Sequence, residues 1–82
     1  MYRRIGKMVY VIFGAAPVSA RTWYGVTTLP EGCRPSQEIN AACVGGDHRQ
    51  YCGVVQAQTS GMVRIYANTA SNYWGTISFP VN

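Results

Sequence analysis

The chain has 82 residues, enough for one domain, and 48% of them are apolar, so a hydrophobic core is available. Charged residues make up only 12% of the chain, with a net charge of +4. The basic residues are scattered apart from Arg3, Arg4 and Lys7, whereas proteins that bind nucleic acid usually carry a denser basic patch. We therefore expect no nucleic-acid partner. So short a chain buries roughly 60% of its unfolded surface. We therefore expect it to depend on a disulfide, a metal or partner subunits.

The N-terminal stretch has two interpretations. Its basic start, an apolar run and then Val18-Ser19-Ala20 follow the order found in a secretory signal peptide. The run is too short to cross a membrane, and no membrane insertion is expected. Its β-branched and aromatic residues, with Tyr10 among them, favour a strand over a signal helix.

Glycine and proline recur at short intervals, which is typical of a series of short strands. We predict six strands, at residues 7–13, 21–29, 37–44, 51–58, 62–67 and 73–79. No helix of useful length is expected. The prediction is an all-β fold, a small antiparallel β-sandwich or barrel of jelly-roll type, formed by residues 1–82 as a single domain. Such a fold leaves open edge strands, and pairing with identical subunits is one way to cover them.

Three of these segments carry distinct signals. The stretch 7–13 is apolar on both faces, which predicts burial on both sides or packing against another subunit, and residues 14–17 are expected to end it. The segments 51–58 and 62–67 form the strongest hairpin signal, with Gly61 where a left-handed residue is wanted. In the last strand, alternation places Tyr73, Ile77 and Phe79 on one face.

The opposite face of that last strand carries Trp74 beside Thr76 and Ser78, so Trp74 is expected near solvent. Pro80 should end the strand because it has no N–H to donate to a neighbour. In the second predicted strand, Trp23 and Tyr24 should point to opposite faces.

The stretch LPEGCRPSQEI, residues 29–39, predicts a stiff corner between strands. Its prolines fix φ and lack an N–H donor, and its glycine permits a positive φ between them. Leu29 is expected in the core, while Glu31 and Arg34 are placed for a local ion pair. The corner residues are Leu29, Pro30, Gly32, Arg34 and Pro35.

The motif LPEGCRPSQ resembles the LPEGYRPS signature of C-terminal head domains on phage tail fibres and receptor-binding proteins, mostly from phages and prophages of Gram-positive bacteria. Three further stretches are similar in order and spacing: YRRIGKMVYV, SGMVRIYA and YWGTISFPV. Together they cover almost the whole chain. Cys33 stands where the family pattern usually has an aromatic residue. The chain also begins with a methionine close to the first strand, whereas members of the family usually follow a long shaft, so we expect either an excised head or a stand-alone copy.

The resemblance implies a non-enzymatic homotrimeric head at the tip of a virion tail fibre, assembled in the host cytoplasm and joined to an upstream shaft. Its expected partner is a bacterial cell-surface glycan. Saccharide sites typically combine an aromatic face with several short polar groups. The alternative is a purely structural trimerisation or capping module, with recognition elsewhere. The candidate ligand-binding residues are Asp47, His48, Arg49, Tyr51, Asn72, Tyr73 and Trp74.

The cysteines leave three states open. Cys33, Cys43, His48 and Cys52 include the residue types of a Cys₃His zinc site, but no close C-x₂-C pair is present. Cys43 and Cys52 flank a Gly-Gly turn and are candidates for a disulfide across a hairpin. Free thiols used as small packing residues are favoured, because phage tails assemble in a reducing cytoplasm. No cofactor or metal is therefore expected.

Catalysis has little support in the sequence. A glycosidase needs two facing carboxyl groups, and the acids are Glu31, Glu38 and Asp47 only. The single histidine, His48, follows Asp47 in what we expect to be a polar turn, and no serine lies in a nucleophile elbow. We predict a binding or structural protein rather than an enzyme.

Overall fold

The structure is a computed structural model and describes residues 1–81. Its seven strands are β1 (Tyr2–Ile5), β2 (Met8–Val18), β3 (Tyr24–Thr28), β4 (Ile39–Gly45), β5 (Tyr51–Ala57), β6 (Met62–Ala67) and β7 (Ser71–Pro80). The described residues contain no helix, and so none that is long and apolar enough to cross a membrane. The prediction of an all-β fold is confirmed, with one strand more than expected.

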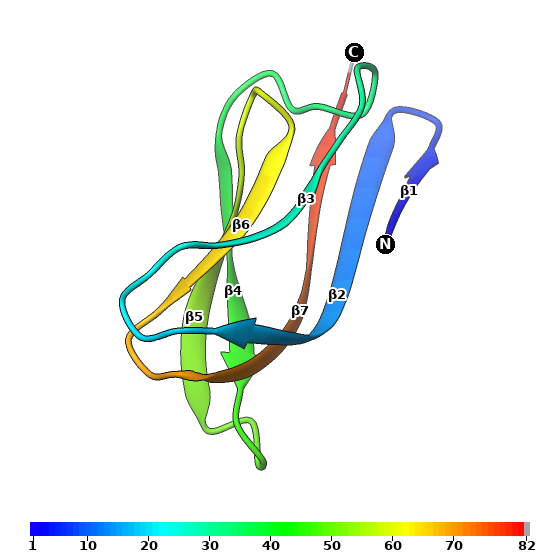
Figure 1. Cartoon of the computed structure of the whole chain (residues 1–82). Helices are drawn as coiled ribbons and strands as arrows, with labels where there is room; N and C mark the ends of the chain where they lie inside the picture. Colours follow the sequence, from blue (N-terminus) through cyan, green and yellow to red (C-terminus); the bar gives the residue numbers. More distant parts are fainter. Residues whose placement is uncertain (82) are drawn as a thin grey trace.

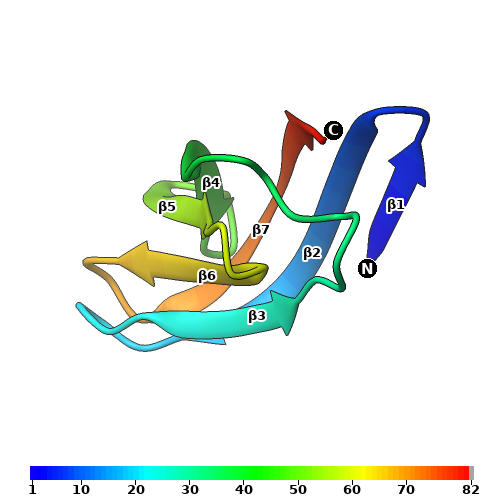
Figure 2. The same cartoon turned by 90° about the horizontal axis from the view of Figure 1, so that it is seen from above.

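All seven strands belong to one antiparallel sheet in the order β1-β2-β7-β4-β5-β6-β3 (Figure 1). Seen from above, the sheet curls into a half-barrel, and β3 returns to contact β2 (Figure 2). The core lies inside the curl. We call the opposite, convex side the outer face. We predicted a sandwich or barrel. The structure has a single curled layer that surrounds the core as half of a barrel.

The strand missing from the prediction is β1. It pairs with β2 from Tyr2 opposite Val11 to Ile5 opposite Met8. The intervening turn is only two residues long, and Gly6 supplies a φ of 60°. The sequence analysis treated these residues as a basic start, because a four-residue strand with charged side chains has little pattern of its own.

The first predicted strand was also expected to end at residues 14–17, which is wrong. β2 runs on to Val18 through a bulge between Phe13 and Ala16, where Ala15 has a φ of 52°. A bulge adds an unpaired residue and lets a strand bend without leaving the sheet. The long, bent β2 can therefore follow β7 along most of its length.

Only one of the two apolar faces of β2 is buried in the chain. Val9, Val11 and Phe13 point into the core, whereas Tyr10 and Ile12 lie on the outer face, where Ile12 is 57% exposed. The expectation of burial on both sides is therefore met on one side within the single chain.

The middle strands follow the predicted order with shifted ends. β3 is shorter than predicted: Arg21, with a φ of 53°, lies before it, and Leu29 lies after it. β4 falls within one or two residues of its predicted bounds. The predicted hairpin of β5 and β6 is confirmed, and Gly61 has a φ of 93° in its turn.

The face assignment of β7 is confirmed as well. Tyr73, Ile77 and Phe79 are buried, Trp74 is half-buried, and the strand ends at Pro80 as predicted. Directly opposite Tyr73 stands Gly45, where an added Cβ would lie 2.6 Å from the tyrosine ring. The ring occupies space that only glycine leaves free.

The LPEGCRPSQEI corner has Leu29 fully buried, as predicted. The Cys33 N–H donates to the Pro30 carbonyl (3.1 Å), and Gly32 between them has a φ of 90°, which is a type II turn. From β1, Arg4 Nη1 donates to the Gly32 carbonyl (2.6 Å).

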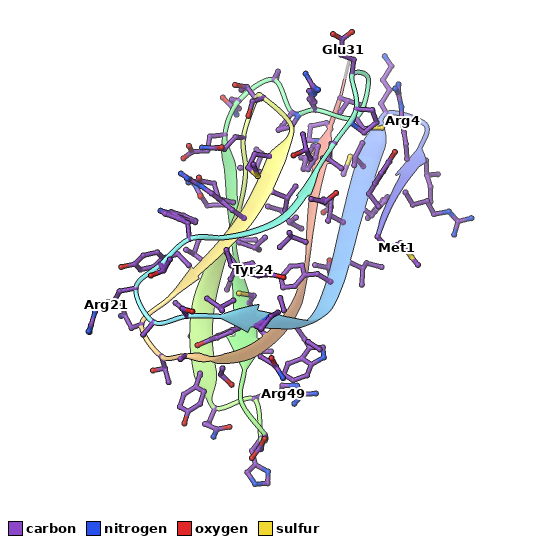
Figure 3. All side chains as sticks on the ribbon, in the orientation of Figure 1. Met1, Arg4, Arg21, Tyr24, Glu31 and Arg49 are labelled. Carbon is purple, nitrogen blue, oxygen red and sulfur yellow. The ribbon has the colours of Figure 1, made fainter. Side chains whose placement is uncertain are left out.

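Arg34 also fastens the corner, but not through the expected ion pair. Its Nε donates to the Leu29 carbonyl (2.9 Å), while Glu31 projects away from the molecule (Figure 3). The Leu29 N–H donates to the Gly61 carbonyl (2.8 Å), and Pro35 is buried. The corner is thus docked on the β5–β6 turn.

That docking makes Gly61→Ala more damaging than Gly6→Ala. Both changes place a side chain at positive φ, which costs about 1–2 kcal/mol. A Cβ at Gly61 would also lie 2.5 Å from the Leu29 oxygen, whereas nothing lies within 4 Å of one at Gly6. We expect Gly61→Ala to lose about 1–3 kcal/mol more stability in urea unfolding. Equal losses would contradict the docked corner.

Candidate functional site

The loop between β4 and β5 carries three of the predicted ligand-binding residues. Asp47, His48 and Arg49 are exposed there, and Figure 3 places Arg49 at the end of the molecule opposite Glu31. Arg49 has a φ of 58°, and its Nη1 donates to the Gly46 carbonyl (2.9 Å). The His48 N–H donates to Gln50 Oε1 (2.9 Å). These bonds define a compact polar turn.

The same loop reaches Trp74 on β7. The Arg49 guanidinium carbon lies 3.7 Å from the centroid of the Trp74 ring, which is a cation–π contact. A Cβ on Gly14 of β2 would lie 2.8 Å from Trp74 Cδ1, so the indole packs directly on that glycine. The Gly46 N–H donates to the Asn72 carbonyl (3.2 Å) and ties the loop to β7.

Two of the predicted residues lie elsewhere. Tyr73 is fully buried, and its hydroxyl donates to the Thr69 carbonyl (2.8 Å). Tyr51 is half-buried and packs against the core. Alternation along a strand explains this result, because Tyr73 and Trp74 are neighbours and must face opposite sides. The surface set is reduced to Asp47, His48, Arg49, Asn72 and Trp74.

Burial changes the acidity of two groups beneath this end of the sheet. Burial, with a smaller contribution from Cys52, raises the pKa of the Cys43 thiol above its ordinary value. Burial likewise raises the pKa of the Tyr73 hydroxyl, with smaller contributions from Cys43, Tyr51 and Cys52. Both groups are therefore held in their neutral forms, as suits the core.

The three cysteines do not meet. Cys43 faces Gly53 across the β4–β5 ladder, and Cys52 faces Val44, so the two thiols point to opposite sides of the sheet. All three thiols are free, with Cys43 buried, Cys52 exposed and Cys33 half-buried at the corner. Within residues 1–81, no group of three or more His, Cys, Asp or Glu side chains is arranged to hold a metal ion. The hairpin disulfide is excluded by the register.

The acidic side chains are spread over the molecule. Glu31 lies at the tip of the corner, and Asp47 lies in the β4–β5 loop, whose Arg49 is at the opposite end of the molecule (Figure 3). Glu38 precedes β4, and its Oε2 accepts a hydrogen bond from Asn40 Nδ2 (3.4 Å). The described part of the chain has no pocket.

The structure also assembles a group of polar residues that sequence reasoning missed. Asn40, Gln56 and Arg64 stand directly opposite one another on β4, β5 and β6, and we call them the polar row. Arg64 Nε donates to Gln56 Oε1 (2.8 Å), and Gln56 Nε2 donates to Asn40 Oδ1 (3.2 Å).

An aromatic pair flanks the polar row. The Arg64 guanidinium carbon lies 3.9 Å from the Trp23 ring centroid, and the Trp23 and Tyr66 rings are 5.3 Å apart. The predicted β5–β6 hairpin carried part of this signal, since its register sets Gln56 opposite Arg64. Trp23 and Asn40 join them only through the pairing of β3 with β6 and of β4 with β5.

Comparisons with known proteins add no family to these observations. No protein-family model matches the chain, and no curated protein matches it. The similarity to fibre head domains therefore remains a resemblance carried by the motifs described above.

The opposite orientation of Cys43 and Cys52 predicts unequal reactivity toward iodoacetamide. Only the thiolate reacts, and the raised pKa of Cys43 lowers its thiolate fraction at any given pH. Cys43 is also 2% exposed, whereas Cys52 is open to solvent. Peptide mass spectrometry of the folded protein should find Cys52 alkylated first and Cys43 last. Denaturant should remove the difference, and equal rates in the folded protein would contradict the structure.

Proposed function

We propose that the chain is a non-enzymatic head module of a phage tail fibre that assembles as a homotrimer and binds a bacterial surface saccharide. The observation that carries the proposal is an apolar, unpartnered part of the outer face, on a chain whose corner resembles that of fibre heads. Its members are Ile5, Tyr10, Ile12 and Val44, which we call the apolar half.

The apolar half is the surface best suited to contact other subunits. Ile5 and Ile12 are each 57% exposed, and β7 lies between the β2 and β4 parts of this surface. Burying apolar surface contributes about 25 cal/mol per Å², so several such side chains buried in each subunit would offset the thin core of a short chain. Three copies arranged around a fibre axis would each bury this surface.

The end of the sheet at the β4–β5 loop, which we call the loop end, supports saccharide binding. Trp74 offers an aromatic ring fixed by Arg49 and Gly14, and exposed Asp47, His48 and Asn72 supply polar groups from the same end. Saccharide rings combine an apolar C–H face with hydroxyl groups, and such a set matches both. A capping module with recognition elsewhere is the second candidate, and it needs only the apolar half.

Ile12→Asp should dissociate the proposed trimer. The side chain lies outside the core, so the subunit should still fold, while each interface would lose about 1.5–3 kcal/mol of burial and gain a desolvated charge. Light scattering coupled to gel filtration should give the subunit mass. Thr28→Asp, an exposed strand position on β3, is the control and should stay trimeric. A trimer in both variants would place the interface elsewhere.

Trp74→Ala should weaken binding to bacterial surface polysaccharides on a glycan microarray, because the loss of the indole removes the aromatic contact and frees Arg49. The oligomeric mass should be unchanged. Tyr2→Ala, an exposed aromatic position on β1, serves as the control. Polysaccharide binding that survives in Trp74→Ala would remove the loop end from the site, and no binding by the unmodified protein would favour the capping module.

A further inference from the structure

The polar row and its aromatic pair form a second surface on the outer face, separate from the loop end. It crosses β4, β5 and β6 and ends at Trp23, just before β3. We propose that this surface is a binding site for a neutral pyranose saccharide, with Trp23 as the stacking platform. The inference deepens the proposed function and rests on it for the biological setting.

The Arg64 and Tyr66 side chains hold the Trp23 ring in place. The guanidinium of half-buried Arg64 lies over one face of the Trp23 ring, and Trp23 is 38% exposed, so part of the indole remains open to solvent. Tyr66 abuts the ring at an interplanar angle of 54°. An indole held by both the Arg64 and the Tyr66 contacts loses little conformational freedom when a ligand stacks on it, which favours binding.

The hydrogen bonds of the polar row hold Arg64 in place. Gln56 is only 8% exposed and bonds Arg64 on one side and Asn40 on the other, while Asn40 bonds Glu38. A network of this kind fixes its members before a ligand arrives. The bonds use one N–H each from Arg64, Gln56 and Asn40, and each of these groups has further N–H donors.

The charges at the two ends of the row decide the ligand class. Arg64 is cationic, and Glu38, which accepts a hydrogen bond from Asn40 at the other end, is anionic, so the row together with Glu38 has no net charge. Amide, carboxylate and guanidinium groups supply the donors and acceptors that vicinal hydroxyls use, and the exposed indole face suits the C–H face of a pyranose. This combination favours a neutral sugar over an anionic one.

The location also leaves the surface available in the proposed assembly. The exposed side chains of the apolar half come from β1, β2 and β4, and the aromatic pair comes from β6 and the segment before β3. In the sheet order, β1 and β2 lie at one edge and β6 and β3 at the other. The two surfaces meet at β4, where Val44 and Asn40 lie near opposite ends of the strand. Subunit packing on one part of the outer face would leave the other part free.

The test is a nuclear magnetic resonance titration of the ¹⁵N-labelled full chain with the methyl glycosides of glucose, galactose, N-acetylglucosamine and rhamnose. We expect at least one sugar to give saturable shifts of the Trp23 indole and Gln56 amide signals. Trp23→Ala should weaken that affinity about tenfold. Trp23→Phe should restore part of it, and Tyr2→Ala should leave it unchanged.

Asn40→Ala provides a second variant, since its exposed side chain is not needed for the core and its loss should also weaken binding. Shifts confined to the Trp74 indole would overturn this inference while leaving the proposed function intact. No shift with any of the sugars would overturn it as well, and the microarray would then decide the proposed function separately. A proline-rich peptide that shifts the Trp23 signals when no sugar does would overturn the saccharide assignment.

Discussion

The sheet depends on the short ladder that joins β4 to β7. Only two residue pairs form it, Val44 with Trp74 and Gly45 with Tyr73. Every other contact in the ladder order lies within β1-β2-β7 or within β4-β5-β6-β3. Gly45 is essential at this joint because the Tyr73 ring lies where its Cβ would be. The ring fills the core on the inside while its neighbour Trp74 faces outward.

The same joint organises the candidate sites. On one side of it lie Ile5 and Ile12 of the apolar half, which are exposed in the described chain, while Val44 belongs to the joint itself. On the other side lies the polar row, where each side chain bonds the next. The β4–β5 loop closes over the joint, and Arg49 stacks on Trp74 there. A single curled layer therefore presents two chemically different surfaces on its convex side, which suits a module that packs against copies of itself and still binds a ligand.

Local patterns predicted most of the elements. The β5–β6 hairpin followed from alternation and from Gly61, and the faces of β7 followed from its period-two pattern. The bulge in β2 was missed because Gly14 and Pro17 are typical of a break, and only the pairing of β2 with β7 shows that the strand continues. β1 was missed because its side chains are exposed and give no burial signal.

The candidate site was predictable only in part, for the same reason. The residues of the β4–β5 loop are close in sequence, so their grouping could be foreseen, whereas the contact of Arg49 with Trp74 spans distant strands. Tyr73 was included although its position beside Trp74 already required the opposite face.

The sequence by itself determined the strand-rich character, the turns at glycine and the rigid corner at LPEGCRPSQEI, because these follow from the preferences of neighbouring residues. The tertiary structure alone decided which strands lie side by side, and hence that Trp23, Arg64, Gln56 and Asn40 form one surface. Pairing between distant strands depends on register and on the curl of the whole sheet, which no local pattern encodes.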